Sequence, residues 1–264
     1  MNEALMPFFW VGITFPTLLF MQRWIHRHLR GVALLITGRM MWAVIIYAII
    51  LLPGVLLHEL SHWVTARRLG VRTGSLSLIP QIKQDGSVQL GYVEYYKGRN
   101  LGPVRESLIG AAPLITGTLA VLLIGLHIFD ITALGQAIQS GQIDQLTQAL
   151  GQVFSAPDFL VWLYLIFAIS NAMMPSASDR QAWPTFLLLL LVVLLAALVL
   201  GGQEVMVQGL LGPVATVLGF LGLAFSLAIG VDLVFIGVIM LLEKGISRIR
   251  GVEVVYEGVD ALPS

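Results

Sequence analysis

The stretch LLPGVLLHELSHWVTARRLG, residues 51–70, joins an apolar run to two histidines, a glutamate and a pair of arginines. The run begins near residue 40, so it supplies about 20 residues, enough for a helix that crosses roughly 30 Å of hydrocarbon. His58, Glu59 and His62 lie near the end of this helix, where ionisable groups are costly unless they are paired or bound. The stretch therefore predicts a membrane helix that carries a polar functional cluster.

The whole chain has the composition of an integral membrane protein. Of its 264 residues, 57% are hydrophobic and 11% are charged, and the formal net charge is zero. It has no block of Lys and Arg suited to a phosphate backbone, so a nucleic-acid partner is not expected. Cysteine is absent, which excludes disulfides, thiolate catalysis and cysteine metal ligands. Any metal must therefore be bound by histidine and carboxylate.

Six apolar stretches approach the length of a membrane-crossing helix. They lie near residues 4–21, 40–66, 104–128, 159–175, 184–201 and 213–242. We expect an all-α integral membrane protein with about six transmembrane helices in a single polytopic domain, residues 1–264. Its core covers about 40–183, followed by further helices over 184–243 and a short cytoplasmic tail, 244–264.

The distribution of positive charge predicts the orientation in the membrane. With six spans, the loops 129–158 and 202–212 share one side and contain no Lys or Arg, so the positive-inside rule makes the opposite side cytoplasmic. The segment 22–30 disagrees, because it brings three arginines to the outer side. It is either an interfacial helix or a sign that the first span is misplaced. Arginine far outnumbers lysine, which favours a prokaryotic cytoplasmic membrane.

Two connecting segments have patterns of their own. Residues 74–96 alternate between apolar and polar around Asp85-Gly86, which predicts a small membrane-associated β-hairpin between the second and third spans. Residues 131–154 place Ile and Leu at helical spacing among Gln and Ser. That pattern is typical of an amphipathic helix on the outer surface.

The spacing of His58 and His62 indicates metal binding. Four residues apart on a helix, their imidazoles project from one face one turn apart and can bind one tetrahedral Zn²⁺. Glu59 lies beside them and suits a general base acting on water, whose pKa zinc would lower to about 7. The alternative interpretation is a structural polar cluster that is satisfied within a helix bundle.

A catalytic zinc site needs a third protein ligand and an open fourth position. Asp179 is the best-placed carboxylate, because it follows the fourth span on the same side as the histidines. Other candidates lie on the outer side, as Asp130 does, or, like His26 and His28, in the basic segment. Asp179 has an alternative role as a loop aspartate paired with Arg180.

Three motifs of the chain resemble, in the same order, motifs of the site-2 protease family of intramembrane zinc metalloproteases. The resemblance covers most of residues 50–180. HELSH (58–62) is similar to the family's zinc motif, and GAAPLITG (110–117) is similar to the small-residue and proline motif of its next core helix. NAMMPSASD (171–179) resembles the segment that supplies the last ligand. Arg180 differs from the family pattern, in which glycine usually follows the aspartate.

The resemblance implies a set of site residues. His58, His62 and Asp179 correspond to the ligands of one Zn²⁺ per chain, and Glu59 corresponds to the base. Asn171 corresponds to a donor near the substrate carbonyl or the bound water. The small residues of 110–117 are expected to let the third span approach the second closely.

The expected function is hydrolysis of a peptide bond in a membrane-anchored protein, within or near its transmembrane segment. The partners would be that substrate and membrane lipid, with no oligomeric state indicated. The hairpin 74–96 either pairs with an unwound substrate strand or is only a surface loop. Two other functions stay open: an inactive family member that acts as a membrane scaffold or helix-binding protein, and a proton or metal transporter. Asp232, a second intramembrane charge, serves polar packing, substrate gating or proton transfer.

Overall fold

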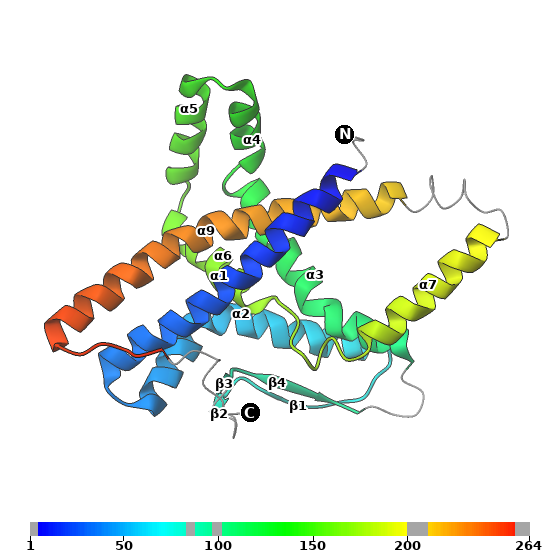
Figure 1. The fold of residues 1–264 in the computed structure, drawn as a ribbon, viewed down its shortest axis with the longest axis horizontal. Coiled ribbons are helices and arrows are strands. Elements are labelled where there is room, and N and C mark those ends of the chain that lie inside the picture. The colour runs from blue at the N-terminus through cyan, green and yellow to red at the C-terminus, as the bar shows by residue number, and fades with distance from the viewer. Residues whose placement is uncertain (1–4, 83–87, 97–101, 200–210, 257–264) are drawn as a thin grey trace.

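The computed structural model describes residues 5–82, 88–96, 102–199 and 211–256, which form a helical bundle with a small antiparallel sheet along one side (Figure 1). The predicted turn at Asp85-Gly86 and most of the predicted outer loop 202–212 lie outside the described residues. The helical membrane class expected from the composition agrees with these elements.

α1 (Met6–Thr37) and α2 (Met40–Arg68) are long helices joined by a short turn. Gly38 closes α1 with φ 67°, a left-handed conformation that glycine adopts without strain. The basic segment 22–30 lies inside α1, because buried residues such as Val32 and Leu35 continue the helix beyond it. It is therefore not a separate interfacial helix, and the first apolar stretch ended too early.

The chain between α2 and α3 forms the predicted hairpin. β1 (Thr73–Ser77) pairs antiparallel with β4 (Tyr92–Tyr95), and β2 (Gln81–Ile82) pairs antiparallel with β3 (Val88–Gln89). Leu78, Val88 and Leu90 pack against the helical core. One face of the hairpin is thereby covered by α2 and its neighbours.

α3 (Pro103–His127) follows the hairpin, and α6 (Phe159–Ala172) packs against both α2 and α3. Between them, α4 (Ile131–Ser140) and α5 (Ile143–Phe154) form a helical hairpin that projects from the bundle (Figure 1). The prediction of a single amphipathic helix over 131–154 is therefore wrong, because two helices form there. The break lies at Gly141, whose φ of 66° ends α4.

α9 (Gly212–Arg250) lies along α1 and runs in the same direction. Near the start of both helices, Trp10 Nε1 donates to Ser226 Oγ at 2.9 Å. Further along both, His28 Nδ1 lies 2.7 Å from Glu243 Oε2. In a serpentine of six spans the first and sixth helices run in opposite directions, so α1 and α9 do not fit those two places together.

Among the described residues, three helices, α2, α3 and α9, are long and apolar enough to cross a membrane. α5 and α6 add a fourth span if they are counted together, with a bend of 87° between them. α6 alone has 14 residues, which is about 21 Å of helix, and α7 (Trp183–Val199) has 17. The described residues thus support an all-α membrane protein with three or four candidate spans.

Apolar side chains face outward as well as inward. The core centres on Leu51, Ile166 and Phe167, where α2 meets α6. On the outside, large side chains such as Phe20 and Leu160 are 72% and 74% exposed. Such an exterior suits lipid, and every buried polar group must then find a partner inside the protein.

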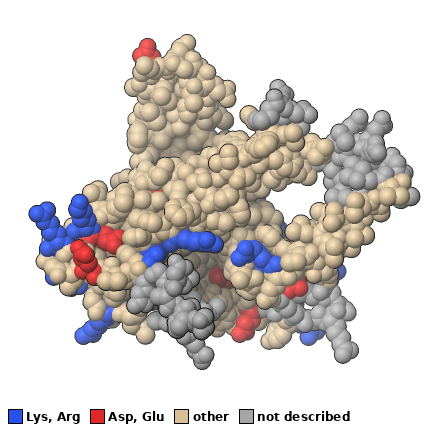
Figure 2. All heavy atoms as spheres, in the orientation of Figure 1, with Lys and Arg blue, Asp and Glu red and all other residues tan. Residues whose placement is uncertain are grey.

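Basic side chains gather on one side of the molecule. Figure 2 shows Lys and Arg in blue over the lower half of this face, and the projecting α4–α5 hairpin has no Lys or Arg in its sequence. The segment 22–30 lies beside the predicted zinc motif, because His26 contacts Asn171 at the end of α6. This segment therefore lies near the end of α6 and not on the opposite side of the molecule.

Candidate metal centre

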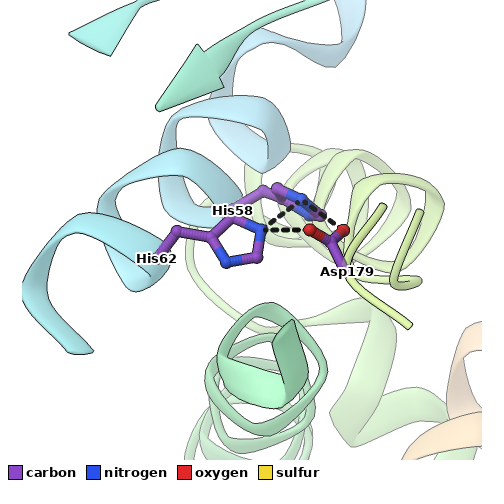
Figure 3. Close-up of side chains that lie close together, drawn as sticks. All are labelled: His58, His62 and Asp179. Atoms are coloured by element: carbon purple, nitrogen blue, oxygen red, sulfur yellow. Dashed lines mark hydrogen bonds and ion pairs between the residues drawn. The ribbon is translucent and has the colours of Figure 1, made fainter. Parts of the chain in front are cut away.

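His58 and His62 lie one turn apart on one face of α2, with their Nε2 atoms 3.1 Å apart. Asp179, in the loop after α6, turns its carboxylate toward both rings (Figure 3). Its Oδ1 is 3.3 Å from Nε2 of His62, and its Oδ2 is 3.8 Å from Nε2 of His58. The structure therefore brings together the three side chains that the sequence suggested as ligands.

Backbone carbonyls determine which nitrogen of each ring faces the cluster. His58 Nδ1 lies 2.6 Å from the carbonyl oxygen of Ala172, and His62 Nδ1 lies 2.9 Å from that of Ile109. A carbonyl only accepts, so each Nδ1 carries a proton and donates it, and each Nε2 keeps a lone pair for the cluster. Metal-binding histidines are usually held in this way.

The donor set fits a metal ion. The two Nε2 lone pairs and the Asp179 carboxylate are all acceptors, so a cation or a proton is needed between them. Tetrahedral ligands at 2.0–2.1 Å from zinc lie roughly 3.3 Å apart, close to the 3.1, 3.3 and 3.8 Å separations found here. Two histidines and one carboxylate would leave a fourth position for water or substrate.

Asp179 is held by its own loop. The backbone N–H of Ser176 donates to Oδ2 of Asp179 at 2.7 Å. Burial raises the pKa of the Asp179 carboxyl, but the neighbouring His62 ring and the hydrogen bonds from Ser176 outweigh burial and hold this pKa at about 2. Arg180, the alternative partner of Asp179, donates instead from Nε to the Ser176 carbonyl at 3.3 Å. The Asp179 carboxylate is thus ionised and directed at the histidines.

Small residues of α3 make room for the ligand loop. A Cβ at Gly110 would overlap the backbone carbonyl of Asp179, and one at Gly117 would overlap the side chain of Met173. The sequence suggested that 110–117 lets α3 approach α2. The structure shows a further reason for these glycines, because they let the loop after α6 lie directly on α3.

A cavity of about 650 Å³ adjoins the cluster, and Glu59 lines it together with both histidines. Glu59 is only 7% exposed and lies close to Gly91 of the hairpin. Residues 88–94 of the hairpin form another wall of the cavity. The glutamate proposed as a base therefore lines the same half-open cavity as the candidate ligands.

Asn171 lines this cavity, but its amide N–H groups are engaged elsewhere. Its Nδ2 donates to Oδ1 of Asp232 at 2.8 Å and to the Phe167 carbonyl at 3.0 Å. Both partners of the amide lie within the protein in this structure, and the donor role that the resemblance implies for Asn171 stays a prediction. Asp232 is fully buried on α9, and its contact with Asn171 favours polar packing between α9 and α6. Asn171 Oδ1 and Asp232 Oδ2 have no hydrogen-bond partner among the described residues.

His26 and Tyr47 also line the cavity. From the sequence, His26 was only one of several candidates for the third ligand, and Tyr47 was not predicted as a site residue. The Tyr47 hydroxyl lies 2.8 Å from Nδ1 of His26, whose Nε2 lies 3.1 Å from the Asn171 carbonyl. The sequence offers one signal for His26: it lies four residues after Gln22, so the two side chains would share one face of a helix. This spacing is informative only if α1 is one continuous helix through the basic segment.

A buried carboxylate beside two imidazoles and a second carboxylate can accept and return protons on water, provided that a metal ion activates that water. Comparisons of this chain with family models, with curated proteins and with solved structures give no significant match.

Proposed function

We propose that the chain is an intramembrane zinc endopeptidase of the site-2 protease type. It hydrolyses a peptide bond of a membrane-anchored protein, within or near the transmembrane segment of that protein. The proposal rests on the meeting of His58, His62 and Asp179, in a chain that has helices of membrane-spanning length. Nε2 of each histidine and the Asp179 carboxylate would bind one Zn²⁺ per chain.

The chemical role of each residue follows from its position. Bound zinc supplies polarisation of water and of the scissile carbonyl. Glu59 accepts a proton from the attacking water, whose oxygen bonds to the carbonyl carbon. The C–N bond then breaks, and Glu59 returns the proton to the leaving amine nitrogen. Burial of Glu59 in the cavity keeps bulk water from competing for these transfers.

The position of the hairpin favours a substrate that binds as an extended strand. A transmembrane helix satisfies its own backbone groups, so its peptide bonds are shielded until it unwinds. Among the described strands β4 has one neighbour, β1, and residues 88–94 line the cavity. The other edge of β4 is thus suited to pair with an unwound substrate strand.

The hairpin that lines the cavity lies on the lower side in Figure 1, where Lys and Arg gather in Figure 2, and this supports a cytoplasmic orientation of the site by the positive-inside rule. We therefore infer cleavage near the cytoplasmic end of the substrate, in a multi-pass protein of a prokaryotic cytoplasmic membrane. A total of six spans would require α1 and α7 to cross as well, and the parallel alignment of α1 with α9 argues against that count.

Glu59→Gln tests the proposal. Parent and variant are reconstituted with a panel of single-span reporter proteins, and cleavage and bound zinc are measured for both. We expect Glu59→Gln to retain zinc and to lose cleavage by a factor of about 10²–10⁴, while the exposed control Glu253→Gln cleaves like the parent. Equal cleavage by Glu59→Gln would exclude the mechanism. Zinc bound by a parent that cleaves nothing would favour a scaffold, and metal transport that survives Glu59→Gln would favour a transporter.

A further inference from the structure

The C-terminal end of α6 is capped by side chains from two other helices. The last carbonyls of a helix have no partner within it, and three consecutive ones in α6 accept hydrogen bonds from outside. The donors are Gln22 Nε2 to the Ser170 carbonyl at 2.6 Å, His26 Nε2 to that of Asn171 at 3.1 Å and His58 Nδ1 to that of Ala172 at 2.6 Å. Two donors come from α1, and the third is a proposed zinc ligand.

The Ser170 carbonyl in particular has no ready substitute for its donor. Ser170 is fully buried, Asn171 and Gln22 are each 4% exposed, and the bundle surrounds them. A buried carbonyl without a donor is costly, most of all in a protein surrounded by lipid. Because Gln22 and His26 are four residues apart, they share one face of α1 and grip successive peptide groups of α6.

Tyr47 fixes the direction in which His26 donates. The Asn171 carbonyl only accepts, so Nε2 of His26 carries the proton, and Nδ1 accepts from the Tyr47 hydroxyl at 2.8 Å. The ring is thereby held at both nitrogens. Tyr47 belongs to α2, as His58 does, so the hydrogen bonds run from α2 through α1 to α6 and return to α2.

We propose that Gln22 and His26 are positioning residues for the metal centre: they hold the last turn of α6 so that the Ala172 carbonyl keeps the His58 ring with Nε2 toward Asp179. This inference rests on the proposed zinc site. The carbonyls of Asn171 and Ala172 belong to adjacent peptide groups, so a shift of one moves the other. Within the described part of the chain, the hydrogen bonds of the Gln22 and His26 side chains go to α6 and Tyr47 and not to the ligand cluster. Both residues act through the backbone of α6.

Zinc affinity of the full-length protein in detergent, measured by competition with a chromophoric chelator, tests this role. His26→Ala and Gln22→Met each remove a cap donor, and each should weaken zinc binding by about 10- to 100-fold, as loss of an outer-shell partner does elsewhere. His26→Gln keeps a donor near the place of Nε2, so it should recover most of the affinity. Zinc binding by both cap variants at parental affinity would overturn the proposal.

His28→Ala is the matched control. His28 lies on the same helix and contacts Glu243 at 2.7 Å, so this variant loosens α1 from α9 without removing a cap donor. It should bind zinc like the parent. If His28→Ala weakens zinc binding as much as His26→Ala does, general packing of α1 explains the effect and the positioning role is wrong.

The ¹⁵N NMR spectrum of histidine-labelled protein without metal separates this proposal from the zinc proposal. His58 should carry its proton on Nδ1 in the parent and in His28→Ala, and it should lose this preference in His26→Ala. If the parent binds no zinc, the zinc proposal fails, but this spectrum still decides the positioning role. An unchanged His58 tautomer in His26→Ala would overturn it.

Discussion

Oδ1 of Asp179 lies 3.3 Å from Nε2 of His62, at the point where α2, α3 and the loop after α6 meet. Backbone groups fix each partner separately, because the Ile109 carbonyl holds His62 and the Ser176 N–H holds Asp179. The cluster is therefore arranged by the fold and not only by attraction between its members. Such preorganisation is what a metal centre requires.

Arg180 should be dispensable for metal binding. Its side chain is exposed and donates to the Ser176 carbonyl instead of pairing with Asp179. We expect Arg180→Gly, the residue that the resemblance suggests, to change zinc affinity by less than about tenfold, while Asp179→Asn lowers it by more. Chelator competition measures both. A loss of zinc in Arg180→Gly as large as that in Asp179→Asn would show that Arg180 shapes the ligand.

Gly110 should be intolerant of a side chain. A Cβ at this position would overlap the Asp179 carbonyl, so Gly110→Ala must displace the loop or strain α3, at a cost of about 1–3 kcal/mol. We expect lower thermal stability and weaker zinc binding. Gly135→Ala is the control, because a Cβ there has no atom within 4 Å. Parental stability and parental zinc affinity in Gly110→Ala would contradict the close packing described here.

Zinc affinity should rise with pH from about 5 to about 8, because protons compete with zinc for the two histidines. Both Nε2 atoms must be free of protons to bind the metal. The pKa of Asp179 is about 2, so its carboxylate stays ionised throughout this range and does not contribute to the acid loss. Chelator competition from about pH 5 to about pH 8 tests the claim. Affinity that does not change with pH would argue against two histidine ligands.

Much of the site was predictable because its signals are local. The four-residue spacing of His58 and His62 determines their common face on α2. The alternation in 74–96 likewise predicted the hairpin, because side chains of a strand alternate between its two faces. These patterns do not depend on how the helices are arranged in space. The choice of Asp179 was not local in this sense, because it depended on the expected order of spans and on the family resemblance.

The path of α1 was not predictable in the same way. Arginines in 22–30 suggested the end of a span, yet the helix continues to Thr37 and packs along α9. A hydropathy profile lowers its value at every polar or charged residue, whether or not that residue has a partner in the fold. His28, for example, is paired with Glu243 of α9. The capping of α6 by Gln22 and His26 depends on this long-range packing and so could not be read from local spacing.

The metal content of the purified protein tests the central claim most directly. Elemental mass spectrometry would compare the parent with His58→Ala, with Asp179→Ala and with Asp130→Ala, in which an exposed aspartate at the start of α4 is removed. We predict close to one zinc per chain in the parent and in Asp130→Ala, and its loss in the other two variants. A parent that binds no zinc after reconstitution, or zinc that remains in Asp179→Ala, would contradict the three-ligand centre.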